Sequence, residues 1–168
     1  MTNDELMDVV DEKDRVIGQA WRSDLYAARS CQFRVINAMV ENARGELWIP
    51  RRTATKKMFP LCLDASVGGH VRSGEGYQAA FFRETREEIN LDLHKAHWQE
   101  LGTLTPYTHG TSAFMRVYQI FLDASPVFNP EDFISCAWIS PQALLETLQN
   151  GQPAKDDLPI ILKAFYGV

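Results

Sequence analysis

The sequence lacks the features that mark several large classes of protein. It has only three cysteines, Cys31, Cys62 and Cys136, and their spacing matches no zinc site, so we expect reduced structural thiols. No apolar stretch approaches the roughly 20 residues that a membrane-spanning helix needs. The N-terminal segment MTNDELMDVV has neither the basic start nor the apolar run of a secretion signal. We therefore expect a cytoplasmic protein with no membrane partner.

An excess of positive charge is also missing. The chain carries 22 acidic and 17 basic residues, a net charge of −5, which disfavours a nonspecific nucleic-acid binder with a broad basic surface. We find no internal repeat, low-complexity tract or long linker. The 168 residues, 45% of them hydrophobic, suffice for a buried core. We therefore expect a single domain over residues 1–168.

The pattern of apolar residues and turn signals predicts alternating strands and helices. Residues 8–20 are expected to form a β-hairpin within an N-terminal extension that covers residues 1–30. Further strands are expected at 33–40, 46–50, 98–104, 113–122 and 135–139. Helices are expected at 23–28, capped by Ser23, at 77–89, at 141–149 after the cap Ser140, and at 156–165. Gly68 and Gly69 are expected to open a loop. The mixture indicates an α/β (α+β) fold with a mixed sheet.

Three glutamates in the helix expected at 77–89 give the strongest indication of function. Glu84, Glu87 and Glu88 are spaced i, i+3 and i+4, so their carboxylates project from one helix face about a turn apart. Such close negative charges repel one another, and a cation between them would turn this repulsion into binding. Carboxylate oxygens are hard ligands that suit Mg²⁺ or Mn²⁺. The spacing therefore predicts metal-assisted attack on a phosphate ester or anhydride.

The segment 69–91, GHVRSGEGYQAAFFRETREEINL, resembles the Nudix box. The residues in register with the box are Gly69, Glu75, Arg83, Glu84, Glu87, Glu88 and Leu91. Thr85 replaces the usual aliphatic residue, and Asn90 replaces the glycine that ends the helix. Neither departure removes a metal ligand. The resemblance implies a Nudix fold, with a mixed sheet between helices, and a hydrolase that acts on phosphorus-containing acid anhydrides with Mg²⁺, or alternatively Mn²⁺, as cofactor.

The resemblance also implies a role for each residue in the site. The metal ligands would be Glu84, Glu87, Glu88 and the Gly69 carbonyl, and Arg83 would pair with Glu75 and orient the cluster. The candidate general base is Asp132, in a loop before Trp138, with one of the box glutamates as the alternative. The substrate-binding candidates are Arg34, Arg51, Arg52 and Glu75, with Arg116 as a further cation. Lys56 and Lys57 are expected to be surface charges.

The front hairpin, residues 34–52 and the segment LDASVGGHV resemble the branch related to isopentenyl-diphosphate isomerase. In that isomerase a catalytic cysteine stands two residues before the histidine of the glycine loop, a position that Gly68 occupies here. Because Gly68 replaces that cysteine, isomerisation is disfavoured and the resemblance favours hydrolysis of a nucleoside diphosphate derivative. The substrate would be a nucleoside di- or triphosphate, pyrimidine ones among them, or a nucleoside diphosphate linked to another group. The alternatives are an isomerase-like activity, a non-catalytic nucleotide-sensing module, and a diphosphatase that acts on a prenyl or other non-nucleoside diphosphate. Monomer and homodimer both remain open.

Overall fold

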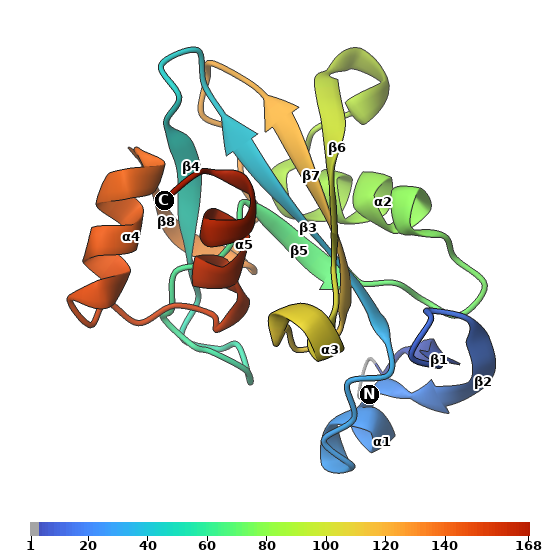
Figure 1. The fold of residues 1–168 in the computed structure, drawn as a ribbon. Coiled ribbons are helices and arrows are strands. Elements are labelled where there is room, and N and C mark those ends of the chain that lie inside the picture. Colours follow the sequence, from blue (N-terminus) through green and yellow to red (C-terminus); the bar gives the residue numbers. More distant parts are fainter. Residues whose placement is uncertain (1–3) are drawn as a thin grey trace.

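A mixed β-sheet forms the centre of the computed structural model, which describes residues 4–168 (Figure 1). Five strands follow the order β6-β7-β3-β4-β8, and β5 pairs with β3 outside this path. β3 runs parallel to β7 and antiparallel to β4 and β5. The strands are β3 (Arg34–Glu41), β4 (Leu47–Arg52), β5 (Val67–His70), β6 (His97–Leu104), β7 (Phe114–Phe121) and β8 (Phe133–Ile139). The predicted mixed α+β fold, with a mixed sheet between helices, is confirmed.

β4 and β5 pair with the same edge of β3, but at opposite ends of that strand. β4 pairs with β3 only at Val40 and Glu41, whereas β5 pairs with the opposite end of β3, from Val35 to Ala38. The prediction that Gly68 and Gly69 open a loop is therefore wrong, because both lie in β5. In the sequence the two glycines suggest a loop because they lack side chains. In the structure this lack allows neighbouring groups to approach the strand closely.

Helices cover both faces of the sheet. α2 (Tyr77–Ile89) packs on one face, over alternate residues of β3 that include Ile36, Ala38 and Val40. α4 (Pro141–Gln149) and α5 (Asp157–Phe165) pack on the other face, which presents Met39 and Val117. The period of two in each strand gives each side of the sheet its own apolar cluster. Two short elements, η1 (Leu93–Lys95) and α3 (Pro106–His109), lie in the connections, and neither was predicted.

α2 begins and ends where the sequence predicts. Asn90 adopts the left-handed conformation, with φ 52°, and its backbone N–H donates to the Arg86 carbonyl, so it closes the helix as a glycine would. Thr85 is fully buried, and its hydroxyl lacks a hydrogen-bond partner among the residues that the structure describes. The aliphatic residue usual at this position would avoid that cost.

The N-terminal hairpin forms a separate two-stranded antiparallel sheet, β1 (Leu6–Val10) and β2 (Val16–Trp21), followed by α1 (Arg22–Ala27). It packs through a small apolar cluster that joins Met7 and Leu25 to Phe33. Ser23 does not cap α1 as predicted. Its hydroxyl lies within the first turn and donates to Asp4 at 2.6 Å. None of the helices formed by residues 4–168 combines the length and apolarity that a membrane span requires.

Candidate active site

α2 holds two of its glutamates against β5. Gly69 lies so close to Glu84 that a Cβ at position 69 would stand 2.1 Å from the carboxyl carbon of Glu84. One strand residue away, the Gly68 N–H donates to the Glu88 carboxylate at 3.1 Å. The third glutamate, Glu87, lies on the exposed part of the same helix side. The two glycines therefore allow buried carboxylates to lie directly against the backbone of a strand.

Arg83 is the centre of an ion-pair network around these carboxylates. Its guanidinium binds both oxygens of Glu75, at 2.9 and 3.0 Å, which is the pairing that the box resemblance implies. It also contacts Glu84 at 2.6 Å and donates to the His70 carbonyl at 2.9 Å. Arg83 is therefore a positioning residue that joins α2, β5 and the loop between them.

The carboxylates carry more negative charge than their protein partners neutralise. Burial raises the pKa of Glu84 to about 7, although Arg83 opposes the shift. Burial also raises the pKa of Glu88 well above its ordinary value, and the negative charges of Glu84, Asp64 and Asp132 add to the effect. For Glu75, burial is outweighed by hydrogen bonds from Arg83 and Arg72, so its pKa is lowered. A positive charge at Glu84 and Glu88 would stabilise both ionised carboxylates.

The donor set fits a hard divalent cation, although its groups are held apart in this structure. Within residues 4–168, no three His, Cys, Asp or Glu side chains converge closely enough to form a ready metal site. In this structure Arg83 binds an oxygen of Glu84, and the Gly68 N–H binds the Glu88 carboxylate. Carboxylate oxygens with unneutralised charge beside strand backbone are the ligand type that Mg²⁺ and Mn²⁺ prefer.

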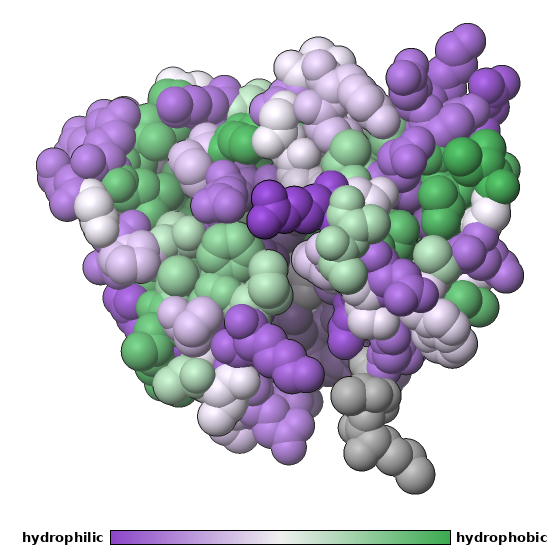
Figure 2. All heavy atoms as spheres, turned by 90° about the horizontal axis from the view of Figure 1, so that it is seen from below, coloured by the Kyte–Doolittle hydropathy of each residue, from purple (hydrophilic) through white to green (hydrophobic). Residues whose placement is uncertain are grey.

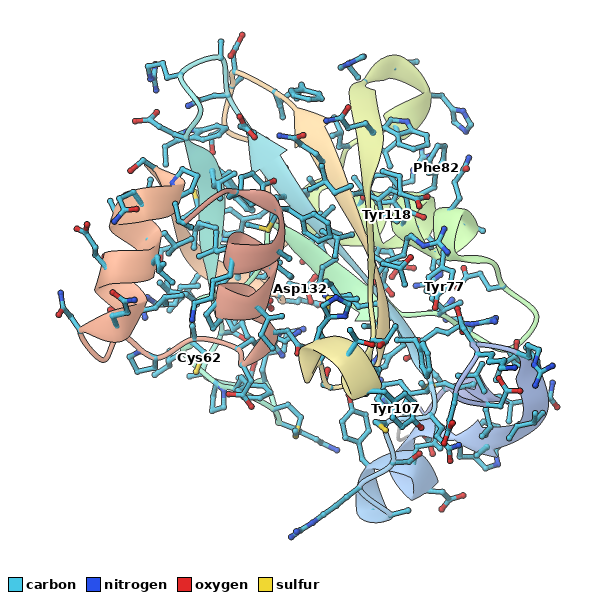
Figure 3. The ribbon with its side chains drawn as sticks, viewed as in Figure 1. Cys62, Tyr77, Phe82, Tyr107, Tyr118 and Asp132 are labelled. Carbon is cyan, nitrogen blue, oxygen red and sulfur yellow. The ribbon has the colours of Figure 1, made fainter. Side chains whose placement is uncertain are left out.

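The structure brings Asp132 to this cluster. The loop that carries Asp132 is anchored to the end of α2, since the Asn129 N–H donates to the Glu88 carbonyl at 2.7 Å. Asp132 is labelled near the middle of the view in Figure 3, and its carboxylate pairs with Lys56 at 2.5 Å. Lys56 is therefore not the free surface charge that was predicted. Lys57, the next residue, is exposed.

The arginines after β4 are held by protein acceptors. Arg52 pairs with Asp64 at 2.8 Å and donates to the Met58 carbonyl, while Arg51 donates to the Leu61 carbonyl at 2.8 Å. Both arginines therefore fix the segment 53–64. Asp64 is almost fully buried, and its charge reaches Glu88. The sequence analysis missed Asp64, whose only signal is an acidic residue within the apolar run from Leu61 to Val67.

Arg34 and Arg116 gather around Tyr77 at the start of α2. Arg34 pairs with Asp14 at 2.6 Å, and the Tyr77 hydroxyl donates to the same carboxylate at 2.8 Å. The Arg116 guanidinium lies over the Tyr77 ring, 4.6 Å from its centroid. Among the described residues, neither guanidinium contacts a carboxylate of Glu84, Glu87 or Glu88 in this structure. The two arginines join the N-terminal hairpin and the sheet to α2.

The N-terminal hairpin also shapes the site, which the sequence did not indicate. Ser73 lies in the loop between β5 and α2. Its backbone N–H donates to the Leu6 carbonyl and its hydroxyl donates to the Asp8 carboxylate, each at 2.8 Å. His70 lies 2.8 Å from the Tyr26 hydroxyl, and burial lowers its pKa to about 4. Seen from below, the face of the molecule where α1 and α3 lie is hollowed near its centre (Figure 2).

Comparisons with known proteins agree with this geometry. The family model described as NUDIX domain matches residues 32–158. An uncharacterized Nudix hydrolase from Nostoc sp. is 54% identical over 96% of both chains, and a Nudix hydrolase from Deinococcus radiodurans is 44% identical over 98% of this chain and 95% of its own. A crystal structure from Deinococcus radiodurans, 44% identical, has a TM-score of 0.93 and covers 96% of this chain and 99% of that one. The chain therefore belongs to the Nudix family of hydrolases, enzymes that act on pyrophosphate bonds.

Proposed function

We propose that this Nudix hydrolase uses Mg²⁺, or Mn²⁺, to hydrolyse a diphosphate linkage in a nucleoside diphosphate derivative. The observation that carries the proposal is the crowding of Glu84 and Glu88 against Gly69 and Gly68, with more negative charge than Arg83 neutralises. Neighbouring carboxylates disfavour each other's ionised form, and groups with perturbed pKa values of this kind concentrate at functional sites.

The residues of the chain would share the work as follows. Glu84, Glu87, Glu88 and the Gly69 carbonyl would hold the metal, which when bound neutralises phosphate charge and favours attack by water. Arg83, fixed by Glu75, would keep Glu84 in the orientation that the ligand set requires.

Proton removal from the attacking water needs a base near the ridge formed by Glu84, Glu87 and Glu88. Asp132 is one candidate, because the contact between Asn129 and Glu88 holds its loop beside α2. Its pairing with Lys56 must then loosen for Asp132 to accept a proton. A box glutamate is the other candidate. Burial raises the pKa of Glu88, so its carboxylate binds a proton more strongly than an exposed one would.

Hydrolysis is favoured over isomerisation by the surroundings of Gly68. Gly68 carries no side chain that could transfer a proton, and a Cβ there would stand 2.7 Å from the Oδ1 atom of Asn37, so any larger residue would have to displace that buried side chain. Cys62 cannot replace it without another backbone path. It lies on the segment between β4 and β5, where its carbonyl accepts the Arg52 N–H (Figure 3).

A substrate panel tests the proposal. The protein would be incubated with Mg²⁺ and nucleoside di- and triphosphates, nucleotide sugars, dinucleoside polyphosphates and isopentenyl diphosphate, and release of orthophosphate and pyrophosphate would be measured. We expect release from at least one nucleotide, and none from Glu88→Gln, because that variant removes a charged ligand while keeping the shape of the side chain. Double-bond migration in isopentenyl diphosphate without nucleotide hydrolysis would overturn the proposal. So would full activity of Glu88→Gln.

A further inference from the structure

Lys155 occupies a fixed position just before α5. Its backbone N–H donates to the Leu63 carbonyl at 2.9 Å, and the Leu63 N–H donates to the Pro153 carbonyl at 2.9 Å. The Lys155 carbonyl in turn accepts the Leu158 N–H at 3.0 Å. Segment 153–155 therefore lies beside the strand-like segment around Leu63, and the Lys155 side chain starts from a backbone that cannot shift easily.

The ammonium group of Lys155 is loosely held. Its nearest acidic partner is Asp64, at 3.6 Å, which is longer than a hydrogen bond, and its side chain is only 26% exposed. The other oxygen of Asp64 is taken by Arg52 at 2.8 Å. Within residues 4–168 no acceptor lies within hydrogen-bond distance of the Lys155 ammonium. A partly buried ammonium with three free N–H donors favours binding of an anion.

Three other cations, Lys56, Arg51 and Arg52, are already engaged by close acceptors. Lys56 is paired with Asp132 at 2.5 Å, while Arg51 and Arg52 donate to the Leu61 and Met58 carbonyls. These groups would have to give up short contacts in order to bind a substrate, whereas Lys155 would give up only its long contact. Lys155 can therefore bind a new ligand with a smaller loss of existing contacts than Lys56, Arg51 or Arg52.

Electrostatic interactions link Lys155 to Asp64 beside Glu88, and also to His70 and Tyr26. Asp64, its partner, is close enough to Glu88 for its negative charge to affect that glutamate. Burial mainly sets the pKa of both His70 and Tyr26, and the positive charge of Lys155 acts on each of them as well. The His70 carbonyl is bound by Arg83, which contacts Glu84. Lys155 is thus within electrostatic reach of both β5 and the neighbourhood of the acidic ridge.

We propose that Lys155 binds a phosphoryl oxygen of the substrate and so acts as a specificity residue for diphosphate-containing ligands. This inference rests on the proposed function, because it places the phosphate chain between the acidic ridge on α2 and the segment before α5. Lys155 would supply a point charge with mobile donors, which suits a phosphoryl group whose orientation changes during the reaction. Asp64 would keep the ammonium extended when no substrate is bound.

Inorganic pyrophosphate is the probe for the test. Its binding to the wild-type protein with Mg²⁺ would be measured by titration calorimetry and compared with that of Lys155→Met and Lys155→Arg. The control is Lys163→Met, which removes an equal charge from the exposed side of α5. We expect about tenfold weaker binding in Lys155→Met, as for the loss of one charged hydrogen bond, and little change in Lys155→Arg and Lys163→Met.

Kinetics supply a second readout. With the best nucleotide of the substrate panel, Lys155→Met should raise KM about tenfold and change kcat less, because the residue binds the ligand and makes no bond to it. If Lys155→Met does not fold, Lys155→Gln carries the same expectation.

Three outcomes would overturn the inference: no pyrophosphate binding by the wild-type protein, unchanged binding in Lys155→Met, or an equal loss in Lys163→Met. The two proposals fail separately. Pyrophosphate binding that depends on Lys155, without hydrolysis of any nucleotide, would contradict only the proposed function.

Discussion

Replacing Glu84 with glutamine is expected to stabilise the metal-free protein at pH 8 while removing its hydrolytic activity. Burial raises the pKa of this carboxyl from 4.5 to about 7 in the folded protein. The folded state therefore binds the proton more tightly than the unfolded chain does. This contribution to stability is present below about pH 4.5 and is lost as the pH rises through 7.

The magnitude follows from the difference between the two pKa values. Going from 4.5 to about 7 corresponds to about 3 kcal/mol of lost stability above pH 7. Glutamine removes the buried charge but keeps an oxygen that can accept the hydrogen bond from Arg83. Because that bond loses its charged acceptor, we expect a net gain of about 1–2 kcal/mol. For a protein of this size the gain raises the unfolding temperature by about 3–6 °C.

Thermal and urea unfolding at pH 5 and pH 8, with EDTA present, would measure the effect. Other groups also titrate in this range, so the informative quantity is the difference between wild type and Glu84→Gln at each pH. Glu87→Gln is the control, since this side chain is 51% exposed and its charge is solvated. Equal pH dependence of wild type and Glu84→Gln would refute the claim that the ridge carries a buried, uncompensated charge. A gain in Glu87→Gln as large as that in Glu84→Gln would refute it as well.

Two further substitutions test the geometry of the site. Gly69→Ala would place a methyl group 2.1 Å from the carboxyl carbon of Glu84, and we expect it to destabilise the protein by about 2 kcal/mol and to abolish turnover. Gly18→Ala is its control, because nothing lies within 4 Å of a Cβ there; equal unfolding curves for the two variants would contradict the tight packing. Asp132→Asn is expected to lower kcat strongly with a modest change in KM, measured by steady-state kinetics. An unaltered kcat would leave Asp132 as a partner of Lys56 alone.

Local sequence signals predict α2 residue for residue. From Tyr77 to Ile89 the chain has no glycine or proline, and the left-handed Asn90 ends the helix. The same local pattern determines that Glu84 and Glu88 share a helix side. Their burial against β5 does not follow from it, because burial depends on how α2 packs on a distant strand. The box pattern supplies that information through Gly69, and spacing alone does not.

The features that escaped prediction depend on contacts between distant segments. β5 reads as a loop because Gly68 and Gly69 carry no side chain, and only pairing with β3 makes it a strand. Asp64 is a lone acid in an apolar run, and its importance comes from Arg52 and from its reach to Glu88. The docking of the N-terminal hairpin on the loop after β5 likewise depends on tertiary contacts that no local pattern encodes.

The central claim is that the carboxylates of α2 bind divalent cations, and titration calorimetry with Mn²⁺ and Mg²⁺ tests it most directly. The account predicts saturable binding to the wild-type protein and binding at least tenfold weaker in Glu88→Gln, whose fold would be checked by circular dichroism. Absence of binding in the wild type, or equal binding in both proteins, would contradict it.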